Sequence, residues 1–253
     1  FWREFRSEVK AIKPELYILG EIWHDSMPWL RGDQFDAVMN YPFTTNILNL
    51  FAKQTITAKE FVENMTSVLH MYPKNVNEVA FNLVGSHDTP RILTECGEDL
   101  ERVKQVFTLM LTFIGTPCIY YGDEIGMIGG QDPGCRKCME WDETEQNREL
   151  YKHVQKLIHL RKKHPLLANV GELSFISPGD YDTCLAYRKS NGSVGKTIFV
   201  VLNTSTAEVE YRIPFKVSGK AVRSLWNDKF IAVSGKDLVV SLPGNGFEIV
   251  EIE

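Results

Sequence analysis

The sequence predicts an α/β protein: the second half of a (β/α)8 (TIM) barrel over residues 1–165, followed by an antiparallel β-sandwich domain over residues 166–253. Up to about residue 164, segments with apolar residues at helical spacing alternate with short continuous apolar runs, which are typical of strands buried in a parallel sheet. Beyond residue 165, short strand-like runs separated by turn residues are typical of a sandwich. The first part holds four strand–helix units, and an eight-stranded barrel normally needs about 250 residues. We therefore expect half of a barrel with an appended all-β domain.

Four segments of the first part have the apolar spacing of a helix with one buried face. Pro14 ends the first segment and Pro165 follows the last, because proline cannot continue a helix. Thr57 and Glu60 form a capping box, in which the two side chains satisfy free backbone N–H groups reciprocally, so a helix is expected to begin there. The apolar faces lie within residues 1–12, 61–69, 103–111 and 150–161.

Strands of the first part are expected where short apolar runs end at a glycine or a proline. They cover residues 16–19, 35–40, 81–84 and 118–121. In the second part, turn residues separate the runs, as at 191–192 and 243–246. The strands expected there cover residues 173–176, 184–187, 197–202, 209–213, 222–225, 238–242 and 247–250.

The composition is that of an ordinary globular protein, with 43% hydrophobic and 24% charged residues. The formal net charge of −5 argues against nucleic acid or an anionic membrane surface as the main partner. No apolar run approaches the length needed to span a bilayer. The chain does not begin with Met, so the absence of a targeting segment decides nothing about export.

Five cysteines, an odd number in a chain of this length, do not indicate a disulfide scaffold. Cys135 and Cys138 have the spacing of two metal ligands, but no second pair completes a four-ligand site. Both lie in a segment rich in glycine, so two reduced thiols in a loop are the favoured interpretation. We therefore expect no metal site here, a reducing compartment and a cytoplasmic location.

Two acids stand where expected strands end. Glu21 comes directly after Gly20 at the end of the first strand, and Asp88 follows Gly85 at the end of the third. Because parallel strands end at one edge of their sheet, where α/β enzymes hold their chemistry, both carboxylates are expected at that edge. Each acid also has a structural alternative. Glu21 could form a salt bridge or cap a helix, and Asp88 could cap the next segment beside a buried, satisfied His87.

Four stretches of the sequence together resemble the later motifs of the α-amylase family of glycoside hydrolases (family 13): residues 20–24, 35–43, 82–89 and 120–126. Two further stretches are similar to its neopullulanase, cyclomaltodextrinase and maltogenic amylase branch: residues 130–133 and 135–139. The resemblance covers nearly the whole chain and is strongest over the first part. It implies a retaining enzyme that hydrolyses α-1,4 and also α-1,6 glucosidic bonds in cyclodextrins, pullulan or starch oligosaccharides, with transglycosylation as a further activity.

The resemblance implies that Glu21 is the general acid/base and that Asp88 stabilises the transition state, with His87 bound to the same sugar. Cleavage of a glycosidic bond commonly uses two carboxylic acids, one of which protonates the leaving oxygen. That acid must stay protonated near neutral pH, which requires burial or a nearby like charge. An apolar run and Trp23 flank Glu21 in the sequence, so it is the more suitable proton donor.

The resemblance also implies that Asp132 and Arg136, in the loop after the fourth strand, bind a sugar toward the non-reducing side. The alternative for these two residues is an ion pair at the surface. Trp23 and Tyr41 are candidates for stacking on sugar rings, although burial is the commoner fate of such aromatics. The other loop acids are interpreted as structural: Asp25, Asp36, Asp123 and Glu124.

The family's nucleophile is the Asp of a Gly-x-Arg-x-Asp motif, and these 253 residues contain no such motif. A retaining mechanism needs that carboxylate about 5 Å from the acid. We therefore expect the C-terminal part of an α-glucan hydrolase that is inactive on its own, with a non-catalytic glucan-binding fragment as the alternative. No cofactor is expected in this portion, because the family's usual calcium ligands would lie upstream. Half a barrel has open sheet edges, which favour self-association.

Overall fold

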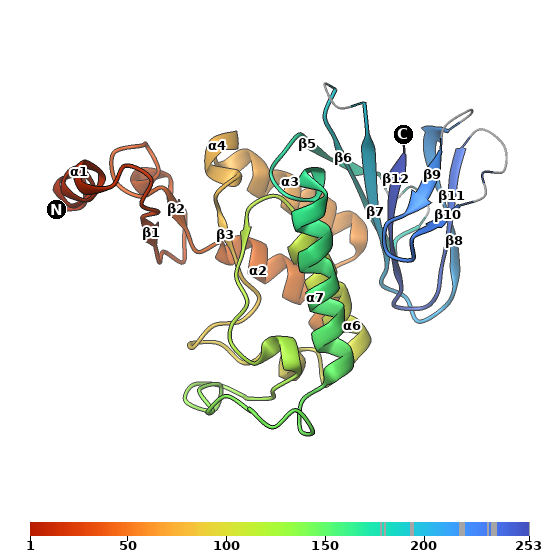
Figure 1. The fold of residues 1–253 in the computed structure, drawn as a ribbon, viewed down its shortest axis with the longest axis horizontal. Coiled ribbons are helices and arrows are strands. Elements are labelled where there is room, and N and C mark those ends of the chain that lie inside the picture. The colour runs from red at the N-terminus through yellow and green to blue at the C-terminus, as the bar shows by residue number, and fades with distance from the viewer. Residues whose placement is uncertain are drawn as a thin grey trace.

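The structure is a computed structural model that describes residues 1–177, 179, 181–192, 195–217, 221–231, 233 and 237–252. Glu253, the last residue of the expected second domain, lies outside this set. Helices and very short strands make up the first part, and long antiparallel strands make up the second (Figure 1). The prediction of an α/β portion followed by an antiparallel sheet region is confirmed.

The first part is mainly helical. Its α-helices are α1 (Trp2–Ile12), α2 (Tyr41–Ile47), α3 (Ala58–Met71), α4 (Lys74–Asn77), α5 (Ile92–Glu95), α6 (Leu100–Thr112) and α7 (Arg148–Lys163). Shorter helical turns are η1 (Met27–Trp29), η2 (a π-helix, Leu48–Ala52), η3 (Asp123–Ile125) and η4 (Pro165–Leu167). The capping box that predicted the start of α3 is confirmed, with both reciprocal hydrogen bonds of Thr57 and Glu60 present.

Helix α1 forms where the apolar spacing predicts it, but its apolar face is covered only in part. None of its residues is buried, and the flanking Phe1 and the terminal Ile12 are 84% and 83% exposed. Val9 packs against a buried hydrophobic cluster, and charged residues hold the helix as well. Arg6 and Lys10 pair with the two carboxylate oxygens of Asp36 at 2.8 and 2.9 Å. Asp36 is thus a structural acid that anchors α1, as the sequence predicted.

Four short strands lie parallel in chain order. They are β1 (Leu19–Gly20), β2 (Ala37–Val38), β3 (Phe81–Asn82) and β4 (Thr116–Pro117). Strand β1 pairs with β2 and β3 pairs with β4, while a parallel bridge from Met39 to Phe81 joins the two pairs. The carboxyl ends of all four strands therefore point the same way, as the sequence predicted.

Two of the expected strands are displaced. The first was predicted at residues 16–19 but begins only at Leu19, and the fourth was predicted at residues 118–121 but lies before them in β4. The apolar run from Cys118 to Tyr120 is only half-buried, because in the described part of the chain no strand pairs with the other side of β4. A continuous apolar run therefore indicated a strand buried on both sides where the structure has a loop.

The second part contains eight strands among the described residues: β5 (Glu172–Ile176), β6 (Cys184–Ser190), β7 (Thr197–Asn203), β8 (Val209–Lys216), β9 (Val222–Ser224), β10 (Lys229–Phe230), β11 (Asp237–Leu242) and β12 (Phe247–Ile252). One antiparallel sheet has the order β10-β9-β12-β7-β6-β5, and a second consists of β11 and β8. The sequence pattern does not predict β10, because its two residues are exposed and show no alternation.

The six-stranded sheet, called the central sheet below, packs against other elements on both faces. Ile198, Val200 and Leu202 of β7 belong to the cluster formed with the helices, whereas Phe199 and Val201 face β8 and β11. Alternating side chains of one strand thus fill two cores, as the period of a strand requires.

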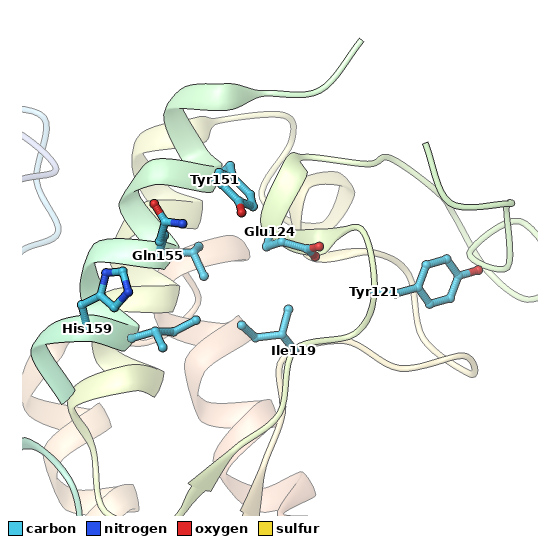
Figure 2. Close-up of a pocket in the computed structure, with 8 residues that line it drawn as sticks. Ile119, Tyr121, Glu124, Tyr151, Gln155 and His159 are labelled. Atoms are coloured by element: carbon cyan, nitrogen blue, oxygen red, sulfur yellow. The ribbon is translucent and has the colours of Figure 1, made fainter. Parts of the chain in front are cut away.

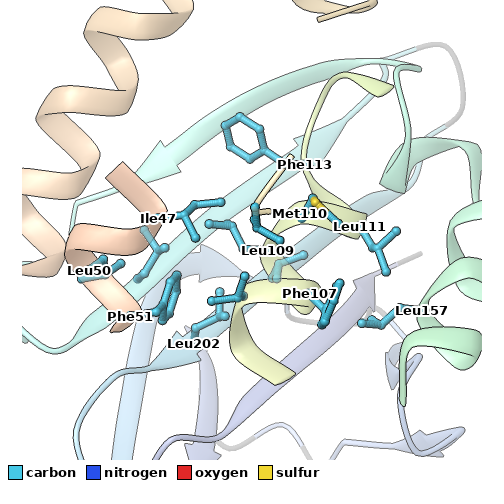
Figure 3. Close-up of a cluster of buried hydrophobic side chains, with 14 of the residues drawn as sticks. Ile47, Leu50, Phe51, Phe107, Leu109, Met110, Leu111, Phe113, Leu157 and Leu202 are labelled. Carbon is cyan, nitrogen blue, oxygen red and sulfur yellow. The ribbon is translucent and has the colours of Figure 1, made fainter. Parts of the chain in front are cut away.

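Helix α6 lies in the hydrophobic core, and every residue from Val103 to Thr112 is buried. Its side chains meet those of α2, η2, α7 and β7 in one hydrophobic cluster (Figure 3). Gln105 Nε2 donates to the carbonyl of Asn203 at 2.7 Å, which joins α6 to β7. The two parts therefore share a core. In the portion of the chain that is described, no helix is both long and apolar enough to cross a membrane.

Candidate active site

Glu21 follows β1 directly after Gly20, whose backbone packs closely against the ring of Phe35. A Cβ atom at Gly20 would lie 2.4 Å from the ring of Phe35, so only glycine lets the chain pass this ring. Beyond it the Glu21 side chain is exposed, and Tyr41 Oη donates a hydrogen bond of 2.9 Å to Glu21 Oε1. The apolar enclosure that the sequence suggested for Glu21 is not present in this structure.

Tyr41, a stacking candidate for which the sequence also allowed burial, is buried and contacts two of the predicted site residues. Its ring lies flat against Trp23, with 3.5 Å between centroids and 13° between planes. Burial, followed by the hydrogen bond to Glu21, raises the pKa of Tyr41, and the charge of Asp88 acts in the same direction. The raised pKa favours the protonated phenol, which is the form that donates the hydrogen bond to Glu21.

Two side-chain amides, the half-buried Asn40 and the buried Asn82, place Tyr41 relative to β3 and β4. Asn40, the N-cap of α2, accepts a hydrogen bond from the Phe43 backbone and donates one of 2.8 Å to Asn82. Asn82 in turn donates 2.7 Å to the carbonyl of Ile114, just before β4. Because the cap fixes the first turn of α2, these bonds hold Tyr41 at the carboxyl end of the strands.

Asp88 lies in the loop after β3 and forms an ion pair with the loop after β4. Arg136 Nη2 donates to Asp88 Oδ1 at 2.9 Å, and Arg136 Nε lies 2.8 Å from Asp132 Oδ1. The same Nε donates to the carbonyl of His87 at 2.9 Å, and His87 Nε2 lies 3.3 Å from Asp88. The structure thus brings together four residues that the sequence proposed as site residues, and all four retain solvent access.

Cys135 and Cys138 have different surroundings. Cys135 is buried and its thiol donates to the carbonyl of His87 at 3.1 Å, whereas Cys138 is exposed. All five cysteines are unpaired thiols. Cys135 therefore supports the loop that carries His87 and Asp88, which its sequence spacing did not indicate.

Trp23 presents one free face. Tyr41 covers the other face of the indole, and the residue remains 55% exposed. A flat, exposed aromatic surface beside carboxylates and a guanidinium is suited to a ring with apolar and hydroxylated faces. Trp23 is thus not the buried aromatic that the alternative reading of the sequence described.

A pocket of the structure lies elsewhere. It has a volume of 360 Å³ and lies between the segment after β4 and α7, where Ile119, Tyr151 and His159 line it (Figure 2). None of the site residues predicted from the sequence lines this cavity. The chemistry-bearing side chains instead form an open surface at the carboxyl ends of the strands.

Comparison with known proteins identifies the class. The model of the family "Alpha-amylase", described as alpha amylase, catalytic domain, matches residues 1–170, and the chain therefore belongs to the alpha-amylase family. Within that family, it falls in the maltogenic amylase and cyclomaltodextrinase branch. It is 66% identical over 253 residues to the maltogenic alpha-amylase of Bacillus acidopullulyticus. The match covers 99% of this chain and 42% of that protein.

Solved structures agree. A cyclomaltodextrinase is 41% identical with a TM-score of 0.92, over 100% of this chain and 43% of its own. The cyclic alpha-maltosyl-(1→6)-maltose hydrolase from Arthrobacter globiformis, solved in complex with maltose, is 27% identical with a TM-score of 0.82, over 98% of this chain and 52% of its own. The chain thus spans about half or less of the length of these relatives.

Proposed function

We propose that this chain is the C-terminal part of a retaining α-glucan hydrolase with Glu21 as general acid/base and Asp88 as the carboxylate that stabilises the transition state. Its substrates are α-1,4 and α-1,6 glucosidic bonds in cyclodextrins, pullulan or starch oligosaccharides, with transglycosylation as a further activity. One observation carries the proposal: Glu21 and Asp88 follow β1 and β3 of one parallel set of strands, so both carboxylates lie at the same edge.

The surrounding residues have roles in this proposal. Tyr41 orients the carboxyl group of Glu21 through its hydrogen bond, so the acid faces the leaving oxygen. Asp88, fixed by Arg136, provides negative charge next to the positive charge that develops on the sugar. The free face of Trp23 stacks on a sugar ring, while His87, Asp132 and Arg136 bind sugar hydroxyl groups.

The carboxylate that acts as the nucleophile is proposed to come from the rest of the longer protein. Four parallel strands in chain order are half of an eight-stranded barrel, and the second part is its sandwich domain. The exposed part of the apolar face of α1 supports this, because a barrel would cover it. Without a Gly-x-Arg-x-Asp motif, the 253-residue chain is expected to release no product on its own. The unpaired cysteines support a cytoplasmic location.

Substitution of the proposed acid in the full-length protein tests this function. Glu21→Gln keeps the size and the Tyr41 contact but cannot donate the proton, so hydrolysis of maltooligosaccharides should fall by at least about 100-fold. Glu15→Gln, at an exposed position before β1, is the matched control and should retain activity. Near-normal activity of Glu21→Gln would show that the assignment is wrong.

The exposed indole of Trp23 favours a second candidate, a glucan-binding chain without catalysis. Calorimetry of the 253-residue chain with maltohexaose, together with an assay for released reducing ends, distinguishes glucan binding from hydrolysis. Heat of binding without product supports a glucan-binding role for the isolated chain. The absence of binding would remove this candidate.

We also propose that the isolated chain associates with a second copy. In the described part of the chain, β1 pairs only with β2 and β4 only with β3, so each has an unpaired edge. The uncovered part of the apolar face of α1 adds an apolar surface. Light scattering should show a dimer or larger species, and a monomer at micromolar concentration would contradict the proposal.

A further inference from the structure

A buried ion pair lies behind the candidate active site. Arg91, just after the β3 loop, is 0% exposed in its side chain, and Asp123, at the start of η3, is 1% exposed. Their atoms Nη1 and Oδ1 are 3.1 Å apart, and the same Nη1 donates to the carbonyl of Tyr121 at 2.6 Å. The guanidinium also lies over the rings of Tyr120 and Tyr121, 4.7 and 4.8 Å from their centroids.

This pair contacts the loop that carries Asp88. A Cβ atom at Gly85 would lie 2.5 Å from Oδ2 of Asp123, so the carboxylate packs directly against the start of that loop. Arg91 ends the same loop, three positions after Asp88. The loop is therefore held at its beginning by Asp123 and at its end by Arg91, while Asp88 lies between the two fixed points.

The backbone of Arg91 and the ring of Tyr121 connect this region to the loop that carries Arg136. The backbone N–H of Arg91 donates to the carbonyl of Gly129 at 2.9 Å, and the N–H of Gly129 donates to Thr94 Oγ1 at 2.9 Å. Further along that loop, the phenol of Tyr121 donates to the carbonyl of Lys137. The segments 85–91 and 120–127 thus meet at the buried charge pair, and the segment 129–138 is joined to them through the Arg91 backbone and the Tyr121 phenol.

Stability alone is a weak reason for such a pair. Burial of two charges costs more than their attraction returns unless all their polar atoms are satisfied, and apolar replacements are often neutral or stabilising. Here Arg91 Nε, Arg91 Nη2 and Asp123 Oδ2 are buried without a hydrogen-bond partner. Burial also raises the pKa of Asp123 to about 7, although the Arg91 charge acts in the opposite direction. What the pair does provide is direct contact between the segments 85–91 and 120–127. Its guanidinium also packs on the ring of Tyr121, whose phenol holds the third segment at Lys137.

We propose that Arg91 and Asp123 are positioning residues, whose buried ion pair holds the loops of Asp88 and Arg136 in register so that these two side chains meet at the sugar-binding surface. The catalytic consequence of this arrangement rests on the proposed function of Asp88. The loop geometry itself does not, so it can be tested separately.

The test uses a double variant, Arg91→Met with Asp123→Asn, because removal of only one partner would leave an uncompensated buried charge and could unfold the protein. The matched control removes an ion pair of the second part, Arg212→Met with Asp237→Asn, whose charges lie 3.8 Å apart at the surface. Both variants are expected to fold, with melting temperatures close to that of the parent.

Hydrogen exchange in the 253-residue chain tests the positioning without reference to catalysis. In the double variant, amides of residues 86–89 and 130–136 should exchange at least about tenfold faster, while α6 and β7 remain unchanged. Unchanged exchange in both loops would overturn the inference. A general loss of protection would assign the pair to the stability of the fold and would also overturn it.

Kinetics in the full-length protein test the link to the reaction. The double variant should lower kcat/KM on maltooligosaccharides by about 10- to 100-fold at unchanged melting temperature. Added to Asp88→Asn, the double variant should cause no further loss, because the pair acts through Asp88. Wild-type kinetics of the double variant beside an inactive Asp88→Asn would overturn the inference, whereas an active Asp88→Asn would instead contradict the proposed function.

Discussion

Tyr41 Oη lies 2.9 Å from Oε1 of Glu21 and donates a hydrogen bond to it across two neighbouring strands. Tyr41 opens α2, after β2, whereas Glu21 follows β1. The bond therefore depends on the pairing of these strands and on the amide of Asn40 that caps α2. A hydrogen bond from a neutral donor to a carboxylate is among the stronger ones in proteins and fixes its orientation.

We expect Tyr41→Phe in the full-length protein to lower kcat/KM by about 10- to 100-fold, which corresponds to the loss of one hydrogen bond to a charged group. The ring that stacks on Trp23 is retained, so the effect should come from Glu21 and not from sugar stacking. Tyr17→Phe is the control, because its phenol donates to the carbonyl of Val79 outside the site. Equal kinetics of the two variants would contradict this role of Tyr41.

Arg136→Lys should weaken the binding of maltooligosaccharides by about tenfold, because a single ammonium group cannot reproduce the planar contacts of a guanidinium. Arg136 contacts Asp88, Asp132 and the carbonyl of His87 at 2.8 to 2.9 Å. Calorimetry in a Glu21→Gln background measures affinity without turnover. Arg148, which lies 3.8 Å from Glu143, provides the control variant Arg148→Lys. A loss of affinity of the same size in that variant would argue against a specific role of Arg136.

The sequence allowed the strand exits of Glu21 and Asp88 to be predicted, because a glycine after a short apolar run is a local signal. It could not place Tyr41, whose contact with Glu21 depends on how α2 is rotated against β3. It also could not reveal Arg91 and Asp123, because charged residues usually lie at the surface and these two are 32 positions apart. The displaced β4 has a similar cause: a run of apolar residues does not show whether a neighbouring strand covers it.

Lys189 should make stability depend on pH between about 7 and 10. Burial, reinforced by the charge of Arg161, lowers the pKa of Lys189 to about 7, whereas that of an unfolded lysine is about 10.4. Above pH 10.4 the amine is neutral in both states. As the pH falls toward 7, only the unfolded chain binds the proton, so stability falls by up to ~1.4 kcal/mol per pH unit. Below pH 7 both states are protonated and this slope disappears.

Chemical denaturation at pH 7, 8 and 9 checks this expectation. Lys189→Met removes the titrating group at a position that is 1% exposed, so the free energy of unfolding should depend less on pH than in the parent. The free energy of unfolding of the variant should exceed that of the parent by the largest amount at pH 7. Parallel pH curves for the two proteins would show that Lys189 is protonated in the folded state over the whole range.

Arg161 joins the end of the first part to the start of the second through four backbone carbonyls. Its Nη1 donates to Leu111, Phe113 and Leu167 at 2.8 to 3.0 Å, and its Nη2 donates to Gly115 at 2.6 Å. Burial lowers the pKa of Arg161 to about 10, which leaves the guanidinium charged at neutral pH. One cation thus satisfies acceptors at the end of α6, before β4 and in η4.

We expect Arg161→Lys to lower the free energy of unfolding by about 2–4 kcal/mol, because a lysine cannot reach all four carbonyls and each buried acceptor left unpaired costs about 1–3 kcal/mol. Since α6 and the central sheet share one core, calorimetry should show a single transition that moves to lower temperature without splitting. Lys162→Gln, at the exposed neighbouring position, should stay within about 0.5 kcal/mol of the parent. A destabilised but split transition would mean that the two parts unfold independently and that Arg161 stabilises only one of them.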